Sequence, residues 1–234
     1  MNKKSNIAIV LAAGKGSRMK SEIEKQFLGL DGKPLLYYSL KTFEESEIID
    51  QVIVVTNADR ITYVKEAVVE KYHLNKVRAV IKGGKERYLS VWEGLQYLDN
   101  QKEKGNVFIH DSARALVSEE ILERAYQGVK EFKACAVGMP TKDTVKIVNE
   151  QGFVEHTPKR SLVWNVQTPQ VFTMDIAYEA YKRLIKEKVE EVTDDAMVVE
   201  TMLKLPIKLI EGSYENFKIT TPEDLIMAEN LLKK

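Results

Sequence analysis

The stretch Ile7-Ala8-Ile9-Val10-Leu11-Ala12-Ala13-Gly14-Lys15-Gly16-Ser17-Arg18 decides the fold of this chain. Its first five residues are apolar and rich in β-branched side chains, which is typical of a strand buried in a parallel sheet. The residues after the strand carry little side-chain bulk, so backbone N–H groups there can approach an anion closely. Cations cluster in and just after this turn, at Lys15, Arg18, Lys20 and Lys25. These features predict a polyphosphate site at the carboxyl edge of a parallel sheet, with an ordinary strand-to-helix turn as the alternative.

Two common phosphate-binding motifs do not account for this turn. The P-loop pattern G-x-x-x-x-G-K-[ST] does not occur in the chain. The dinucleotide fingerprint G-x-G-x-x-G matches at Gly14 and Gly16, but Met19 stands where its third glycine belongs. The missing glycine disfavours an NAD-dependent oxidoreductase.

Apolar strands and amphipathic helices alternate along most of the chain. Buried strands are predicted at 52–55, 77–81, 107–109, 135–138 and 207–210. Helices are predicted from Pro34 to Ser46, at 59–71, 87–97, 174–187, 194–203 and 222–232, and after Ser118, which is placed to cap its helix. Such alternation requires a mostly parallel sheet covered on both faces. We therefore predict an α/β fold: a single Rossmann-like, doubly wound domain over residues 1–234.

The alternation breaks at Pro140, where a β-hairpin is predicted instead. Its strands are 144–148 and 153–156, and a four-residue turn at 149–152 joins them. An isolated hairpin is marginally stable in water, so this segment should pack on another surface. The surface on which this segment, at about 140–163, packs is either its own domain or another chain.

The composition excludes several classes of protein. Lys plus Arg and Asp plus Glu number 35 each, so no global charge attracts the chain to nucleic acid or to a membrane. The only cysteine, Cys135, lies in an apolar run and is expected in the core. No stretch approaches membrane-spanning length and no signal peptide is recognisable, so a cytoplasmic protein is expected.

Eight motifs, in order, resemble one family over essentially the whole chain: the 2-C-methyl-D-erythritol 4-phosphate cytidylyltransferases of the non-mevalonate isoprenoid pathway. The motifs are Leu11-Ala12-Ala13-Gly14-x-Gly16-x-Arg18-Met19, Lys25-Gln26-Phe27, Gly83-Gly84-x-Glu86-Arg87-x-x-Ser90-Val91, His110-Asp111-x-Ala113-Arg114, Lys142-Asp143-Thr144-Val145-Lys146, Gln167-Thr168-Pro169-Gln170-x-Phe172, Thr193-Asp194-Asp195-Ala196 and Lys218-Ile219-Thr220-x-Pro222-Glu223-Asp224-Leu225. The resemblance implies an enzyme that joins CTP to a sugar-alcohol phosphate and releases pyrophosphate. It also implies a homodimer in which the hairpin arm reaches the active site of the other subunit.

The same resemblance assigns residues to the nucleotide. It implies three catalytic cations, at Arg18, Lys25 and Lys218. The residues implied to bind CTP are Leu11, Ala12, Ala13, Gly14, Gly16, Gly83, Gly84, Arg87, Ser90, Asp111 and Ser112. A base pocket of backbone groups and small side chains would reject purines by shape. Asp111 is expected to bind Mg²⁺ or another divalent cation, or alternatively to order the ligands through its neighbours.

A second set of residues is implied for the phosphate of the alcohol. These are Arg114, Thr144 and Thr168, together with Arg160 contributed by the arm of the other subunit. His110 beside Asp111 is interpreted as a packed strand-end residue rather than a metal ligand, because no spacing groups the three histidines.

The chain departs from the family pattern at two loop positions. Glu24 and Ala115 stand where prolines are usual, and their loss removes fixed φ angles that would stiffen the loops. The alternatives to the main assignment are a ribitol-5-phosphate cytidylyltransferase and a noncatalytic nucleotide-binding protein. The noncatalytic alternative is disfavoured because binding alone would not require Arg18, Lys25, Asp111 and Lys218 together.

Overall fold

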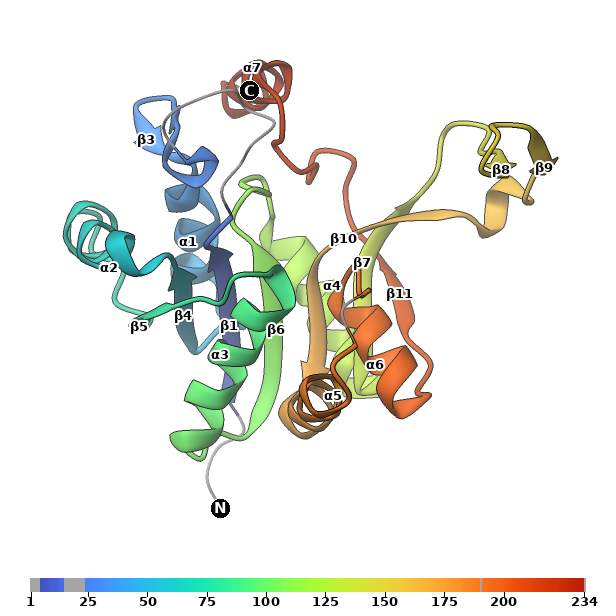
Figure 1. Cartoon of the computed structure of the whole chain (residues 1–234). Helices are drawn as coiled ribbons and strands as arrows, with labels where there is room; N and C mark the ends of the chain where they lie inside the picture. Colours follow the sequence, from blue (N-terminus) through green and yellow to red (C-terminus); the bar gives the residue numbers. More distant parts are fainter. Residues whose placement is uncertain (1–4, 15–23, 190, 234) are drawn as a thin grey trace.

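A seven-stranded, mostly parallel sheet forms the centre of the molecule. The computed structural model describes residues 5–14, 24–189 and 191–233. Within this part, the order of the strands is β11 (Lys208–Glu211), β7 (Ala134–Pro140), β10 (Trp164–Thr173), β6 (Gly105–Asp111), β1 (Ser5–Ala12), β4 (Gln51–Thr56) and β5 (Val77–Lys82) (Figure 1). β1 pairs in parallel with both β4 and β6, and Ile9 lies opposite Ile53 and Ile109. The predicted parallel strand at 7–11 is confirmed.

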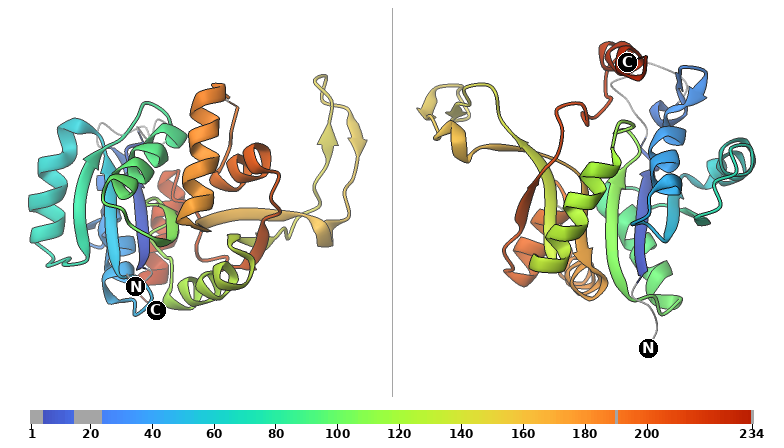
Figure 2. Two further views of the ribbon diagram at one scale, coloured as in Figure 1. Left: turned by 90° about the horizontal axis from the view of Figure 1, so that it is seen from below. Right: turned by 180° about the vertical axis from the view of Figure 1, so that it is seen from behind.

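Helices cover both faces of this sheet. Successive side chains of β1 point to opposite faces and are apolar, so both faces must be buried. Ala8 and Val10 contribute to one apolar cluster, whereas Ile7 and Ile9 contribute to the other. The first face is covered by α1 (Leu35–Glu45), by the helical segment formed by η3 (Ala58–Arg60), α2 (Ile61–Tyr63) and η4 (Val64–Glu70), and by α4 (Glu119–Phe132). The second face is covered by α3 (Arg87–Asn100), α5 (Met174–Glu187) and α6 (Asp195–Leu203) (Figure 2). The predicted doubly wound α/β fold is confirmed.

Strand β10 is absent from the sequence-based prediction. It is inserted between β6 and β7 and runs antiparallel to both. Its polar stretch Gln167-Thr168-Pro169-Gln170 hides the strand pattern, because proline lacks the N–H that a ladder needs. Pairing with β7 shifts between Val166 and Gln170, so this stretch bulges out of the ladder, and the Thr168–Pro169 peptide is cis. The insertion places Thr168 beside the end of β6.

Several local predictions need correction. Pro34 ends a two-stranded hairpin, β2 (Gly29–Leu30) and β3 (Lys33–Pro34), and stands just before α1 rather than in its first turn. The hairpin turn is Asp31-Gly32, where both residues have positive φ, which is a common two-residue turn sequence. Ser118 occupies the position before α4, but its side chain makes no cap hydrogen bond there. The last helix, α7 (Pro222–Leu232), begins with a capping box formed by Thr221, which precedes it, and Asp224 in its first turn.

The predicted hairpin is present but shorter than expected. Its strands are β8 (Ile147–Val148) and β9 (Val154–His156), and η5 (Arg160–Leu162) follows them. Figure 1 shows this arm extending away from the sheet beyond the ends of β7 and β10. Phe153 and Leu162 remain 72% and 77% exposed. In the described chain the hairpin is therefore not packed against its own domain.

The remaining core predictions agree with the structure. Cys135 is fully buried in β7, and burial raises the pKa of its thiol to about 12. Among the described residues, no helix is both long and apolar enough to span a membrane.

Candidate active site

A cleft of about 800 Å³ lies at the carboxyl edge of the sheet, where β1, β5 and β6 end. The lining of this cleft combines bare backbone with charged side chains. The predicted nucleotide-site residues that line it are Leu11, Ala13, Gly14, Gly83, Gly84, Arg87, Ser90, Asp111, Ser112 and Lys218. They come from four separate parts of the chain, so the fold brings most of the predicted nucleotide site together. Ala12 lies beneath this lining, and its carbonyl accepts hydrogen bonds from Gln26 Nε2 and Thr56 Oγ1, at 2.8 and 3.1 Å.

Two glycines keep one wall of the cleft low. A Cβ atom on Gly83 would stand 2.7 Å from Oγ of Ser90, and one on Gly84 would stand 2.3 Å from Cβ of Leu89. A larger residue at Gly83 would displace the Ser90 hydroxyl, and one at Gly84 would require movement of α3. The Gly84 N–H instead donates to Oγ of Ser90 at 3.2 Å, which leaves flat backbone facing the cleft.

A continuous chain of ion pairs begins in the cleft and extends into the protein interior. Nζ of Lys218 lies 2.7 Å from Oδ2 of Asp111, and Nε of Arg87 lies 3.0 Å from Oδ1 of the same carboxylate. The other edge of the Arg87 guanidinium binds Asp195, with both Nη atoms 2.8 Å from carboxylate oxygens. Two carboxylates and two cations therefore alternate along the chain of ion pairs, which we call the charge chain (Lys218, Asp111, Arg87 and Asp195).

Electrostatic interactions fix the protonation states of Asp111 and Arg87 within this charge chain. Burial by itself would raise the pKa of Asp111, but the charges of Arg87 and then Lys218 outweigh burial and hold it far below its ordinary value. Burial would lower the pKa of Arg87, and Asp195 followed by Asp111 raises it well above the ordinary value. Asp111 and Arg87 thus remain charged near neutral pH, and they suit a site that binds charge rather than one that moves protons.

The backbone N–H of Asp111 is bound by a side chain of the neighbouring strand β10. Oγ1 of Thr168 accepts the N–H of Asp111 at 3.1 Å and lies 3.0 Å from Nδ1 of His110. Nε2 of His110 faces the carbonyl of Arg114 at 3.1 Å, and because a carbonyl only accepts, Nε2 carries the proton and Nδ1 accepts from Thr168. Burial lowers the pKa of His110 to about 4. His110 is thus a packed structural residue, as predicted, and the described residues contain no group of three or more His, Cys, Asp or Glu side chains placed for a metal.

The residues predicted to bind the alcohol phosphate do not converge within one chain. Nη1 and Nη2 of Arg114 donate to the carbonyls of Asn216 and Val166, at 2.8 and 3.2 Å, and Nε is buried without a partner among the described residues. Thr144 and Arg160 are exposed on the arm. Thr168 is buried beneath Asp111. The roles of these four residues toward substrate therefore stay predictions.

The turn that follows β1 lies partly outside the described residues. Gly16 and Arg18 are among the residues that the structure does not describe, and of Lys25 only the backbone is described, in η2 (Lys25–Phe27). Glu24 anchors the end of this turn. Its Oε1 lies 3.3 Å from Nε of Arg60, and its Oε2 accepts from Asn57 Nδ2 at 3.0 Å. The residue that replaces the usual proline is thus tethered by polar contacts.

Asp195 lies in one of the family motifs, but the sequence predicted no role for it in the site. The signal was present in Thr193-Asp194-Asp195-Ala196, two acids before a helix. The two acids have different roles, because Asp194 caps α6 by accepting the N–H of Met197 at 2.8 Å, whereas Asp195 binds Arg87.

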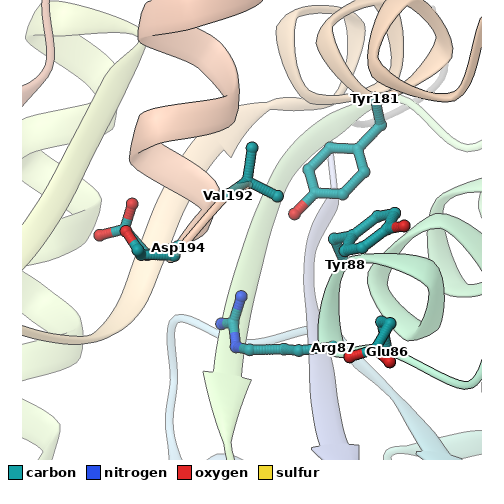
Figure 3. A pocket seen from close by; sticks show the side chains of 7 residues that line it. Glu86, Arg87, Tyr88, Tyr181, Val192 and Asp194 are labelled. Carbon is teal, nitrogen blue, oxygen red and sulfur yellow. The ribbon is translucent and has the colours of Figure 1, made fainter. Parts of the chain in front are cut away.

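A second cavity, of about 400 Å³, lies next to the Arg87–Asp195 ion pair. It is lined by Arg87, Tyr181 and Asp194 among others (Figure 3).

Comparisons with known proteins agree with this geometry. A family model for 2-C-methyl-D-erythritol 4-phosphate cytidylyltransferase matches residues 6–234. Relatives with that name from Lachnoclostridium phytofermentans and Lachnospira eligens are 48% and 47% identical, over 97% of this chain and 96% and 99% of theirs. The crystal structure of 4-diphosphocytidyl-2C-methyl-D-erythritol synthase from Anaerococcus prevotii is similar with a TM-score of 0.86 at 34% identity, covering 99% of this chain and 97% of that one.

Proposed function

Because the chain belongs to the 2-C-methyl-D-erythritol 4-phosphate cytidylyltransferase family, we propose that its cleft binds CTP and transfers the cytidylyl group to 2-C-methyl-D-erythritol 4-phosphate. The products are 4-diphosphocytidyl-2-C-methyl-D-erythritol and pyrophosphate. The chain is thus a CTP-dependent nucleotidyltransferase. One observation supports this site above all: Lys218, Asp111 and Arg87 form ion pairs beside the flat backbone of Gly83-Gly84 at the ends of the parallel strands.

The reaction requires no nucleophile from the protein. A phosphate oxygen of the alcohol substrate, already anionic near neutral pH, attacks the α-phosphorus of CTP. A new P–O bond forms as the bond from the α-phosphorus to the bridging oxygen breaks, and pyrophosphate leaves with the electron pair. Catalysis then depends on positioning two anions and stabilising the charge that grows on the phosphates. We assign this stabilisation to Lys218, Arg18 and Lys25.

Asp111 orients Lys218 in this mechanism. A lysine ammonium on a flexible stem would otherwise sample many positions, and the 2.7 Å contact restricts it to the cleft. Because the pKa of Asp111 lies far below its usual value, the contact persists across the physiological pH range.

The site fits a divalent cation that arrives with the nucleotide. Mg²⁺ keeps several waters and binds through one or two carboxylates together with substrate phosphates. Asp111 supplies such a carboxylate at the cleft, and its neighbours Arg87 and Lys218 disfavour a metal held by protein alone. When bound, Mg²⁺ would withdraw charge from the phosphate oxygens. We therefore assign Asp111 as its protein ligand.

The second substrate and the arm form the remaining part of the proposal. We assign Arg114, Thr144, Thr168 and Arg160 to the alcohol phosphate, with Arg160 serving the site of the other subunit in a homodimer. The exposed position of Arg160 on an arm that leaves its own domain supports this arrangement. Apolar side chains that the single chain leaves exposed on the arm, such as Phe153, would be covered in the dimer.

Pyrophosphate release with defined substrate pairs tests the proposed function. With CTP, we expect turnover on methylerythritol phosphate and much less on ribitol 5-phosphate, and the reverse preference would establish the ribitol alternative. ATP and GTP should be poor donors if a base pocket of backbone groups and small side chains at Gly83-Gly84 rejects purines by shape, whereas UTP, which matches CTP in size, should be rejected less strongly. Binding of CTP without pyrophosphate release on either alcohol would leave the noncatalytic alternative.

A further inference from the structure

The carboxylate of Asp195 is fully buried and does not line the cleft. Both of its oxygens receive N–H groups of Arg87, and Oδ1 also accepts the hydroxyl of Tyr181. Burying an ion pair costs about as much free energy as the pairing returns, so stability alone does not explain it. A buried carboxylate that reaches the cleft through a single partner points to a role in positioning that partner.

Arg87 connects Asp195 to the cleft. Its guanidinium is planar, and it is bound on two edges: both Nη atoms by Asp195 at 2.8 Å, and Nε by Asp111 at 3.0 Å. A planar guanidinium that is bound on two edges can neither rotate nor shift in its plane. Asp111 is thereby fixed at Oδ1, and its Oδ2 remains directed at Lys218.

Asp195 is itself held rigidly at the start of α6. Oε1 of Gln170, in β10, accepts the N–H of Ala196 at 2.7 Å, and Nε2 of Gln170 donates to Asp194 at 3.0 Å. Asp194 in turn caps the helix through the N–H of Met197. The helix N-terminus also favours a negative charge at this position. The position of Asp195 is thus determined by the central sheet.

Arg87 has space to move if Asp195 releases it. The cavity of about 400 Å³ on the side of α5 and α6 is lined by Arg87 and Tyr181, and Figure 3 shows both side chains directed toward it. Without the charge of Asp195, the guanidinium could turn into this space. Asp111 would then lose one of the two cations that hold it, and Lys218 would no longer be kept in one place.

We propose that Asp195 is a positioning residue for nucleotidyl transfer, which acts through Arg87 to fix Asp111 and Lys218 at the phosphates. Tyr181 supports Asp195 from behind. The inference rests on the proposed function for its catalytic consequence, whereas its structural part concerns Arg87 alone.

The principal test compares Asp195→Asn with Asp175→Asn in the full-length enzyme. Asp195→Asn keeps the volume and the Tyr181 contact but removes the charge, and we expect kcat to fall about 10- to 100-fold while KM for CTP changes less than about threefold. Asp175→Asn also removes a carboxylate from the first turn of a helix, α5, but its side chain is exposed and lies outside the charge chain, so its kcat should remain within about threefold of wild type. Near-wild-type kcat in folded Asp195→Asn would overturn the proposal.

A double-mutant cycle distinguishes positioning from a general loss of structure. If Asp195 acts through Arg87, Asp195→Asn should cost almost nothing further in an Arg87→Met background, and the two effects on kcat should be far from additive. Additive effects would contradict the proposal. If Asp195→Asn does not fold, Tyr181→Phe replaces it: a loss in kcat of about threefold or more supports the proposal, and an unchanged kcat overturns it.

A spectroscopic measurement separates this inference from the proposed function. The arginine Nε–H resonances can be observed by NMR in ¹⁵N-labelled protein, and the resonance of Arg87 is identified by its absence from Arg87→Met. In the wild type this Nε–H should exchange slowly with water. Asp195→Asn should shift and broaden it, and an unchanged resonance would refute the positioning of Arg87. Wild-type pyrophosphate release tests the reaction alone, so failure of one does not imply failure of the other.

Discussion

Oγ1 of Thr168 lies 3.0 Å from Nδ1 of His110, in a fully buried contact between the inserted strand β10 and the end of β6. The threonine hydroxyl donates to the imidazole and accepts the N–H of Asp111 at 3.1 Å. Protonation of Nδ1 would remove the acceptor of the Thr168 hydroxyl and place a charge in a buried site. The position of Asp111 therefore depends on a histidine that stays neutral.

This contact predicts how stability depends on pH. The pKa of His110 is about 4 in the folded chain against an ordinary value of 6.5, so between these values the unfolded chain binds a proton that the folded chain does not. Stability should therefore fall as the pH drops through this window. From pH 7 to pH 5 we expect the free energy of unfolding to decrease by about 2 kcal/mol from this residue. Urea unfolding at the two pH values measures the effect.

Two variants isolate the contribution of His110 to this pH dependence. His110→Gln should flatten the dependence between pH 4 and 6.5, whereas His156→Gln, on the exposed arm, should keep the wild-type slope. Asp111 titrates in a separate window, because its lowered pKa means that its contribution is lost only below the ordinary value of 3.8. An equal slope in His110→Gln and wild type would refute the assignment.

The second prediction concerns Lys218. Charge on the phosphates grows toward the transition state, so a cation in the cleft should favour that state over bound substrate. Lys218→Met should lower kcat about 10²- to 10³-fold, with a smaller effect on CTP binding. Lys208→Met is the matched control, because Lys208 lies in edge strand β11 over the ring of Phe132 and should change kcat little. Comparable kcat values for the two variants would mean that Lys218 acts only structurally.

The third prediction tests the arm with two inactive proteins. If each site takes Lys218 from one chain and Arg160 from the other, Lys218→Met and Arg160→Ala homodimers should both be nearly inactive. In a mixed dimer one site is intact and the other lacks both residues. Random exchange makes about half of the dimers mixed, so co-refolding should restore about a quarter of wild-type pyrophosphate release.

The result of this mixing experiment is unambiguous once exchange of subunits is verified by a tag pull-down. If both residues serve the site of one chain, every site stays defective and no activity returns. That outcome would show that the arm does not complete a neighbouring site.

The fourth prediction concerns Glu24. Its side chain is 17% exposed and contacts Arg60 and Asn57, whereas Asp59, which also pairs with Arg60, is 73% exposed. Loss of a partly buried contact costs more than loss of a surface ion pair, so Glu24→Ala should lower the free energy of unfolding by about 1 kcal/mol. Asp59→Ala should change it by less than about 0.5 kcal/mol. Denaturant titrations of both variants check the order, and equal effects would mean that Glu24 does not tether the turn.

Local sequence patterns predicted most strands of the sheet and the nucleotide-binding part of the site. The apolar run at 7–11 and the alternation that follows specify a buried parallel strand, because hydrophobic periodicity reflects burial directly. The bare residues Gly83 and Gly84 and the acid at Asp111 end strands of the same sheet, so their convergence at its carboxyl edge could be inferred. Strand β10 could not be inferred, because the polar stretch around Pro169 interrupts the alternation of apolar and polar residues that identifies strands.

By itself, the sequence determined which segments are buried, that the sheet is mostly parallel, and that its carboxyl edge carries glycines and charges. Only the tertiary structure decided which charges meet. Arg87 and Asp195 are 108 residues apart, and Lys218 and Asp111 are 107 apart. Burial is a property of each residue and its near neighbours, so it leaves a periodic trace in the chain. An ion pair between distant segments leaves none, because it depends on where β10 and α6 come to lie against β6 and α3.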